Sequence, residues 1–309
     1  MRILVTGGAG FIGSHVVDVY VQAGHDVFVV DDLSTGKREN LHPHGHFLQA
    51  DIQDPALRQL MVAEKIELVS HHAAQMDVRR SVADPLYDAR VNILGILNVL
   101  EGAREAKVKK FIFASSGGAI YGEQEAFPAD EEHPTHPISP YGVSKRAGEH
   151  YLYFYRVEYG LPYVALRYAN VYGPRQDPHG EAGVVAIFTQ RLLAGEQPVI
   201  NGDGKQTRDY VFVGDVAQAN LAALPVEYTG PLNIGTGSET TVNQLFTTLH
   251  NLTGSSAPEL HGPAKPGEQR RSVLAWNRAA QVLHWRPTVG LEDGLRQTVT
   301  YFRTRNDRH

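Results

Sequence analysis

The sequence predicts an α/β fold, namely a doubly wound parallel sheet followed by a smaller, mixed α/β lobe. Short β-branched runs alternate with longer helical patterns through the first half of the 309 residues. A glycine-rich loop joins the first of these runs to the first helical pattern, and Gly and Pro punctuate the chain more often after about residue 169. Alternation of this kind implies right-handed crossovers between parallel strands.

The expected strands are continuous apolar runs, as required of parallel strands that are covered on both faces. They span residues 2–6, 26–31, 67–71, 110–115 and 162–168. The helical patterns between them lie near residues 11–23, 55–64, 84–106 and 140–160. We therefore predict a larger domain over 1–168 and a smaller lobe over 169–309, with 211–237 returning to the larger domain.

Composition narrows the class of protein. An apolar fraction of 42%, a charged fraction of 20% and a net charge of −5 predict a globular protein without affinity for nucleic acid or anionic membranes. The longest apolar stretch, "VNILGILNVL", is too short to cross a bilayer, and the strand pattern at "RILV" leaves no room for a signal peptide. We expect a cytoplasmic protein.

Two further features bear on metal binding. The chain has no cysteine, so it can form no thiolate metal site. His42, His44 and His46 alternate along one segment, but no carboxylate or cysteine accompanies them in the sequence. We predict an exposed loop there and no metal site.

The glycine-rich loop "TGGAGFIGS" has the spacing of a dinucleotide-binding turn. Gly7, Gly10 and Gly13 provide a tight turn, close approach to a pyrophosphate and close packing of helix on strand. Asp31 ends the second strand at the distance expected for an acid that binds the ribose, and with Asp32 it would repel a 2′-phosphate. These residues favour NAD over NADP, although Lys37 and Arg38 lie nearby. Asp51 and Ile52 are candidates for contacts with the adenine ring, and a capped turn before Pro55 is the alternative.

A second glycine-rich stretch, "FASSGGAIYGE", ends the strand at 110–115. Adjacent glycines cost backbone entropy and offer nothing to pack. We infer that something approaches the backbone at Gly117 and Gly118, with a hydroxyl of Ser115 or Ser116 facing it.

The helix expected at 140–160 carries a candidate proton-transfer pair. Tyr141 and Lys145 are four residues apart and so share one face of the helix. A nearby ammonium favours the phenolate form of a tyrosine. The pair could take a proton from a substrate hydroxyl while NAD takes a hydride from the same carbon.

Eight segments together resemble those of the extended short-chain dehydrogenases/reductases, and within that family the chain is most similar to the UDP-galactose 4-epimerases. The segments are "TGGAGFIGS", "VVDDLSTGKR", "HHAAQ", "VNILG", "FASSGGAIYG", "SPYGVSK", "LRYANVYGP" and "RDYVFVGD". The resemblance implies a Rossmann-type domain, NAD held as a prosthetic group, and oxidation of a nucleotide sugar at C4 followed by rotation and re-reduction. It also implies cofactor contacts at Phe11, Ile12, Ala73, Ala74, Asn92, Tyr141, Lys145 and Tyr168.

The chain departs from the family at the hydroxyl that contacts the sugar O4. In the family a Ser or Thr lies four residues before the tyrosine that matches Tyr121, whereas here Gly117 occupies that position. Some epimerases are similar in carrying a Ser/Thr-Gly-Gly segment, so we assign the role to Ser116, with Ser115 as the alternative. Nucleotide-sugar 4,6-dehydratases carry an Asp-Glu pair after the Thr, and UDP-glucuronate decarboxylases carry a glutamate there. Gly118 and Ala119 supply no acid, which favours epimerisation.

The resemblance also assigns substrate contacts in the smaller lobe. Asn170 and Arg208 match residues that bind the diphosphate, and Lys265 matches a second phosphate-binding cation, with Arg270 as the competitor. Ser272 matches a position beside the sugar's 2-substituent, where a small residue leaves room for an acetamido group. Glucose/galactose-restricted family members resemble one another in carrying a tyrosine at that position.

The resemblance further implies a homodimer formed through the helices near 84–106 and 140–160. Tyr151, Tyr155 and Tyr159 form a stripe on the second of these helices, which by itself is more typical of a core than of an interface. The alternatives are a UDP-glucuronate 4-epimerase, a 4-keto-sugar reductase, or a regulatory module that senses NAD. Such a module would not need Tyr141 and Lys145 in register.

Overall fold

The computed structural model describes residues 1–179, 183–264 and 269–306, and it is built around one seven-stranded parallel sheet. The strands lie in the order β11-β6-β5-β4-β1-β2-β3. Their bounds are β1 Arg2–Thr6, β2 Asp26–Asp31, β3 His46–Gln49, β4 Leu68–His71, β5 Lys110–Ser116, β6 Tyr163–Tyr168 and β11 Gly230–Ile234. Because all seven strands run parallel, their carboxyl ends meet at one edge of the sheet, where open α/β sheets bind ligands. The predicted doubly wound fold is confirmed.

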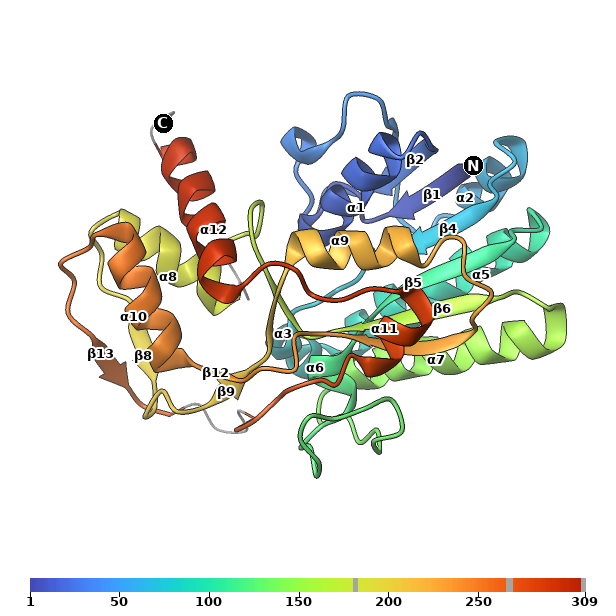
Figure 1. Cartoon of the computed structure of the whole chain (residues 1–309). Helices are drawn as coiled ribbons and strands as arrows, with labels where there is room; N and C mark the ends of the chain where they lie inside the picture. The colour runs from blue at the N-terminus through green and yellow to red at the C-terminus, as the bar shows by residue number, and fades with distance from the viewer. Residues whose placement is uncertain (180–182, 265–268, 307–309) are drawn as a thin grey trace.

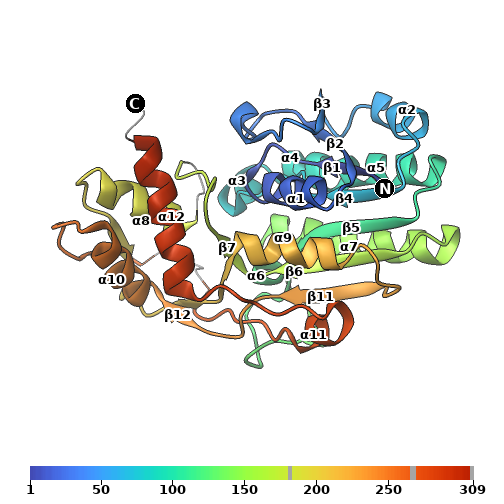
Figure 2. The same ribbon diagram turned by 45° about the horizontal axis from the view of Figure 1, so that its top comes forward.

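Helices cover both faces of this sheet (Figures 1 and 2). One core joins the sheet to α1 (Phe11–Gln22), α9 (Val213–Ala222) and α11 (Asn277–Leu283). The opposite core joins it to α2 (Ala56–Ala63), α5 (Gly95–Glu105) and α7 (Pro140–Tyr159). Alternate residues of one strand enter different cores, as Val29 and Val30 of β2 do, which explains the continuous apolar runs.

A smaller lobe lies beside this sheet and has its own core (Figure 1). Its helices are α8 (Val184–Leu193), α10 (Val242–Thr253) and α12 (Leu291–Asn306). Three strand pairs complete it: β7 (Asn170–Tyr172) with β10 (Tyr210–Phe212), β9 (Thr207–Arg208) with β12 (Thr240–Thr241), and β8 (Val199–Asn201) with β13 (Leu260–Gly262). No helix in the described ranges is long and apolar enough to span a membrane.

The chain returns from the smaller lobe to the larger one twice. The first return is made by α9, which packs against α1, and β11, which pairs with β6. The second was not predicted. Leu274, Ala279 and Leu283 lie in the core of the larger lobe, because α11 covers the edge strand β11. The segment that carries Leu274, Ala279 and Leu283 therefore belongs to the larger lobe and not to the predicted smaller lobe of 169–309.

Four local elements differ from the sequence prediction. The helical pattern at 84–106 is divided into α4 (Pro85–Ala89), a π-helical turn (Arg90–Leu94) and α5. The helices α3 (Val78–Ala83) and α6 (Gly117–Ile120) were not predicted. His46 begins β3 instead of lying in a loop, and its Nε2 lies 2.8 Å from an Asp26 carboxylate oxygen.

Candidate active site

The loop between β1 and α1 has the geometry of a dinucleotide cradle. Gly7 has a φ of +69°, and a Cβ added to it would lie 2.6 Å from the backbone nitrogen of Ala73. A Cβ on Gly13 would lie 2.2 Å from the Gly7 carbonyl oxygen, so neither position tolerates a side chain. Helix α1 starts at Phe11 with Gly10 as its N-cap, without a side-chain cap and without an acidic residue in its first turn. Its free N–H groups therefore suit an anionic pyrophosphate.

Asp31 lies beside this cradle at the carboxyl end of β2. Its carboxylate accepts hydrogen bonds from the backbone nitrogens of Ala9 (3.0 Å) and Leu33 (2.8 Å). Burial raises the pKa of Asp31, and the two hydrogen bonds act against that rise. Asp32 is exposed and accepts from the backbone and hydroxyl of Ser34. The cradle and Asp31 together fit the pyrophosphate and the ribose of NAD.

Three other predicted cofactor residues have partners within the protein. Asp51 accepts a 2.8 Å hydrogen bond from the Gln53 nitrogen, so the capped turn that was the alternative to an adenine contact is present. Ile52 is buried and packs against Gly95. The hydroxyl of Tyr168 accepts a 2.8 Å hydrogen bond from Asn220. Their contacts with a cofactor stay predictions.

Asn92 lies in the π-helical turn and connects several elements. Its amide nitrogen donates to the Gln75 carbonyl (2.8 Å), to Asp88 (3.0 Å) and to Ser144 (3.3 Å), and its oxygen accepts from the Gln75 nitrogen. Asn92 thereby joins the segment after β4 to α7. Ala73 and Ala74 lie in that segment, half-buried beside the glycine loop.

Tyr141 and Lys145 lie in the first two turns of α7, which Ser139 caps by accepting from the Gly142 nitrogen (3.2 Å). Lys145 is buried, and its Nζ donates to the carbonyl oxygen of Ala114 in β5 (2.9 Å). The same Nζ lies 5.8 Å from the centre of the Tyr141 ring. The Ser116 side chain lies close enough to the Tyr141 phenol to act on its pKa. The structure therefore brings together all three predicted catalytic residues at the carboxyl end of β5.

The protonation of this pair differs from the sequence prediction. Burial raises the pKa of Tyr141 to about 12, although the nearby Ser116 side chain acts to lower it. Burial also lowers the pKa of Lys145 to about 8, which the negative charge of Asp88 partly offsets. We predicted that the ammonium would favour the phenolate, but in the protein alone desolvation of the phenol is the larger effect.

The two candidate serines are distinguished by their partners. Ser115 is buried and donates a 2.7 Å hydrogen bond to Glu149, whereas Ser116 is half-buried and reaches Tyr141.

The inference that a ligand approaches Gly117 needs correction. A Cβ on Gly117 would lie 2.4 Å from a Leu274 methyl carbon, so a side chain of the protein fills that space. At Gly118 the nearest atom is Asn170 Oδ1 at 3.7 Å, which leaves its surroundings more open.

The predicted substrate residues lie on two adjacent segments of the smaller lobe. The Thr207 nitrogen donates to the Arg270 carbonyl and the Asp209 nitrogen to the Ser272 carbonyl, each at 2.9 Å. Arg208 is half-buried, while Arg270 is 66% exposed and lies 3.2 Å from an Asp203 carboxylate oxygen. Ser272 is buried, and Lys265 lies outside the described residues. Asn170 lies next to these segments, because its backbone nitrogen donates a hydrogen bond to the Asp209 carbonyl.

Three buried charged residues that the sequence did not single out support this site. Glu149 and Arg167 form an ion pair behind Ser115, and Asp209 accepts from the Thr236, Gly237 and Leu274 nitrogens. Glu149 lies four residues after Lys145, so helical spacing could have identified it. No local pattern marks Arg167 or Asp209, because their partners are distant in the sequence.

Comparisons with known proteins agree with this geometry. Residues 3–235 match the model of the NAD dependent epimerase/dehydratase family. The UDP-glucose 4-epimerase of Mycolicibacterium smegmatis is 48% identical over 313 residues, covering 99% of this chain and 100% of that protein. The structure of the UDP-glucose 4-epimerase of Thermotoga maritima with UDP-glucose superimposes with a TM-score of 0.97 at 52% identity, covering 99% of this chain and 100% of the other.

A Thermus thermophilus UDP-glucose 4-epimerase in complex with NAD has a TM-score of 0.93 at 48% identity, over 98% of this chain and 99% of the other. The resemblance drawn from the eight sequence segments is therefore confirmed, and so is the dependence on NAD. The chain belongs to the NAD dependent epimerase/dehydratase family.

Proposed function

We propose that the protein interconverts UDP-galactose and UDP-glucose by oxidising C4 of the sugar and reducing it again from the opposite face. The observation that carries this proposal is the proximity of Ser116, Tyr141 and Lys145 at the end of β5, next to a cradle that fits NAD. Relatives that cover nearly the whole chain at about half identity carry the same activity in their names.

Each residue of the pair has a definite task in this reaction. In its phenolate form, Tyr141 takes the proton of the sugar O4 hydroxyl and later returns it, and Ser116 hydrogen-bonds the same O4. Lys145, held by the Ala114 carbonyl, favours the phenolate form that the base requires. NAD, held by the glycine loop and Asp31, would supply the hydride acceptor for C4 and the donor for its re-reduction. The glycine cradle and Asp31 hold the pyrophosphate and the ribose, which orients the cofactor against the end of β5.

Epimerisation is favoured over elimination or decarboxylation by the residues that follow Ser116. Gly117, Gly118 and Ala119 lie in α6 and provide neither a general acid nor a general base. A UDP-glucuronate 4-epimerase or a 4-keto-sugar reductase would be built on the same fold and remains the enzymatic alternative. An NAD-sensing regulatory module would not require the Tyr141–Ser116 contact.

We further propose that the diphosphate of the substrate binds Asn170 and Arg208. Arg208 presents a planar cation suited to phosphate oxygens. It lies beside the segment 270–272, which carries the second candidate cation, Arg270, and the candidate specificity residue, Ser272. The small Ser272 side chain supports activity on UDP-N-acetylgalactosamine as well.

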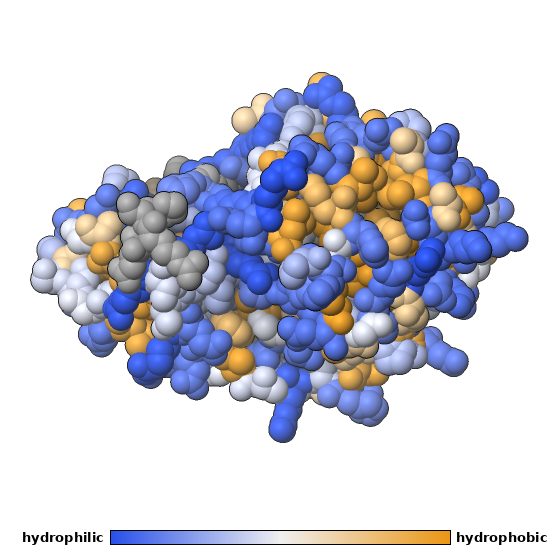
Figure 3. All heavy atoms as spheres, turned by 90° about the horizontal axis from the view of Figure 1, so that it is seen from above, coloured by the Kyte–Doolittle hydropathy of each residue, from blue (hydrophilic) through white to orange (hydrophobic). Residues whose placement is uncertain are grey.

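A homodimer through α7 and the neighbouring helices is the expected assembly. The larger lobe carries apolar surface (Figure 3). Val143, Phe154 and Val157 of α7 are 50%, 48% and 67% exposed, and Leu86 and Leu94 are 73% and 56% exposed. Exposed apolar side chains on neighbouring helices are typical of interaction surfaces. Sedimentation of the purified protein would measure the assembly. The cytoplasmic location stays a prediction.

The activity is tested by incubating the purified protein with UDP-galactose, with no NAD added. We expect UDP-glucose to form, because the reaction cycle never needs to release NAD and the protein should retain it through purification. A preparation that contains no nicotinamide cofactor, and that acts only when NADP is supplied, would contradict the proposal.

A further inference from the structure

Helix α7 approaches the end of β5 at three successive turns and is hydrogen-bonded to it at two of them. Tyr141 meets Ser116, Lys145 donates to the Ala114 carbonyl (2.9 Å), and Glu149 accepts from Ser115 (2.7 Å). The three helix residues are four apart and lie along one face. The last of these contacts has no part in the proposed reaction, although it holds the residue next to Ser116.

The helix lies close enough to the strand for these contacts because Gly148 faces it. A Cβ on Gly148 would lie 2.9 Å from the Phe113 ring, so only glycine permits this spacing without a shift of the ring. The position of α7 relative to β5 is therefore set closely, and Glu149 follows directly after that glycine.

Glu149 is itself fixed by an unusual set of partners. Its two carboxylate oxygens accept from Nε and Nη2 of Arg167 in β6, at 2.9 and 2.7 Å, and from Arg146 at 2.9 Å. Glu149 is 4% exposed and Arg167 is 2% exposed. Burial acts to raise the pKa of Glu149, but Arg167, Ser115 and Arg146 together hold the pKa below its ordinary value. The residue is thus a buried, bidentately bound carboxylate with a single hydroxyl partner, Ser115.

We propose that Glu149 is a positioning residue for catalysis: by holding Ser115, it fixes the end of β5 so that the Ser116 hydroxyl stays on Tyr141 and on the sugar O4. This inference rests on the proposed roles of Tyr141 and Ser116. A buried ion pair is weak evidence for stability, since its desolvation cost offsets its attraction. Placement of the neighbouring hydroxyl explains why these charges are buried at this point of the sheet.

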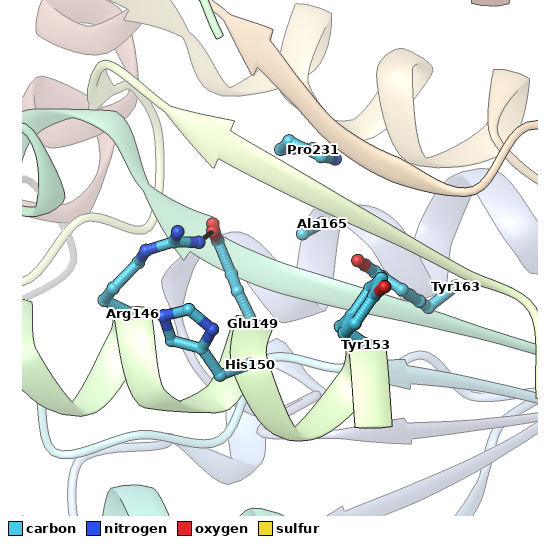
Figure 4. Close-up of a pocket in the computed structure, with 7 residues that line it drawn as sticks. All are labelled: Arg146, Glu149, His150, Tyr153, Tyr163, Ala165 and Pro231. Atoms are coloured by element: carbon cyan, nitrogen blue, oxygen red, sulfur yellow. Dashed lines mark hydrogen bonds and ion pairs between the residues drawn. The ribbon is translucent and has the colours of Figure 1, made fainter. Parts of the chain in front are cut away.

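A cavity beside Glu149 makes the proposal testable by chemical rescue. The cavity has a volume of about 280 Å³ and lies between α7 and the strands β6 and β11, lined by Arg146, Glu149, His150, Tyr153, Tyr163, Ala165 and Pro231 (Figure 4). Figure 4 shows Arg146 and Glu149 turned toward each other at one end of it. Tyr153 is 63% exposed, so the cavity reaches the surface. A formate ion could therefore enter and occupy the place of a deleted Glu149 carboxylate.

The experiment compares Glu149→Ala, Ser115→Ala and the control His150→Ala, each as NAD-bound protein. His150 lines the same cavity on the same helix but is exposed and outside the proposed machinery. We expect Glu149→Ala and Ser115→Ala to lower kcat by on the order of 5- to 10-fold, less than Ser116→Ala does, with little change in KM for UDP-galactose, because a misplaced reacting group costs rate more than binding. His150→Ala should match the wild type.

Formate should restore most of the kcat of Glu149→Ala and none of that of Ser115→Ala, whose missing hydroxyl formate cannot supply. A Ser115→Ala protein that turns over at the wild-type rate would overturn the inference, even if Glu149→Ala fails to fold. So would a folded Glu149→Ala protein in which formate raises the melting temperature but not kcat. Failure of the proposed function would instead appear as a wild type that does not epimerise UDP-galactose.

Discussion

The charged side chains Lys145, Glu149 and Arg167 near the end of β5 are buried and hydrogen-bonded within the protein, whereas the candidate cations of the smaller lobe lie nearer the surface. Lys145, Glu149 and Arg167 are each less than 5% exposed and hydrogen-bonded. Arg270, in contrast, is 66% exposed and pairs with an exposed aspartate. Surface pairs of that kind contribute little to stability, because water competes for both partners.

This difference indicates how each region binds its ligand. We call the junction of β5 and α7 the catalytic side, and the segments of the smaller lobe that carry Arg208 and Arg270 the substrate side. The catalytic side is formed before the sugar arrives, which suits groups that must be placed for a transition state. The substrate side presents cations whose partners can be exchanged for phosphate oxygens. Changes on the first side should therefore lower kcat, and changes on the second should raise KM.

The largest expected effect is that of Tyr141→Phe. Without the phenol oxygen no side chain takes the O4 proton, and loss of a general base typically lowers the rate by about 10²- to 10⁴-fold. Because the ring remains, affinity for the UDP-sugar should change little. Steady-state kinetics with UDP-galactose measure both quantities, and a variant with near-normal kcat would assign the base elsewhere.

Ser116→Ala should have a smaller effect of the same kind. The hydroxyl orients O4 but does not itself take the proton, so we expect a loss on the order of 10- to 100-fold in hydride transfer. Single-turnover nicotinamide absorbance reports this step directly. If Ser115→Ala were slower than Ser116→Ala, the role at O4 would move to Ser115.

On the substrate side, Arg208→Gln should raise KM by on the order of 10-fold with a minor loss of kcat, because it removes one charged hydrogen-bond donor to the diphosphate. Arg270→Gln is the matched comparison and should have the smaller effect if Arg270 serves its surface partner Asp203. Equal effects on kcat from Arg208→Gln and Tyr141→Phe would erase the distinction between the two sides.

The substitution Ser272→Tyr tests which sugars the substrate side accepts. We expect it to preserve turnover of UDP-galactose and to suppress that of UDP-N-acetylgalactosamine, because a large side chain excludes the acetamido group by steric clash. The ratio of kcat/KM for the two sugars, in wild type and variant, measures the effect. A wild type inactive on the N-acetyl sugar would contradict the assignment of Ser272.

The smallest expected effect is on stability and concerns the buried Lys145. Its pKa is about 8 in the folded protein and 10.5 ordinarily, so between these pH values the unfolded chain binds more protons and the stability of the wild type rises with pH. Lys145→Met lacks this gain. Denaturant unfolding measures the free energy of unfolding of both proteins at pH 7 and at about pH 9.5. Between these two pH values, the free energy of unfolding of the wild type should rise by about 2 kcal/mol more than that of the variant. A difference that is independent of pH would show that the ammonium is not destabilised by burial.

The sequence predicted the sheet well where burial dictates composition. Strands β1, β2, β4, β5 and β6 are covered on both faces, so each is a continuous apolar run. Strand β3 lies at the edge of the sheet, with Leu48 41% exposed, and therefore leaves no such run. The π-helical turn was missed because the helical pattern continues through it without a break.

The site was predictable where its chemistry is local. The spaced glycines lie within one turn, between β1 and α1. Tyr141 and Lys145 lie within one helix, α7. Glu149 has functional meaning only beside Ser115 and Arg167, which lie 34 and 18 residues away. The space at Gly117 is taken by Leu274, far along the chain, which no local pattern can show.

The contrast between the two sides is tested most directly by hydrogen exchange of the NAD-bound protein with and without UDP. If the catalytic side is preformed, the amides of 114–117 and 141–149 should exchange at the same rate in both states. The amides of 203–209 and 269–272 should become protected when UDP binds, since the diphosphate orders their side chains and strands. Protection that appears at 114–117 and 141–149, with none at 203–209, would contradict the account.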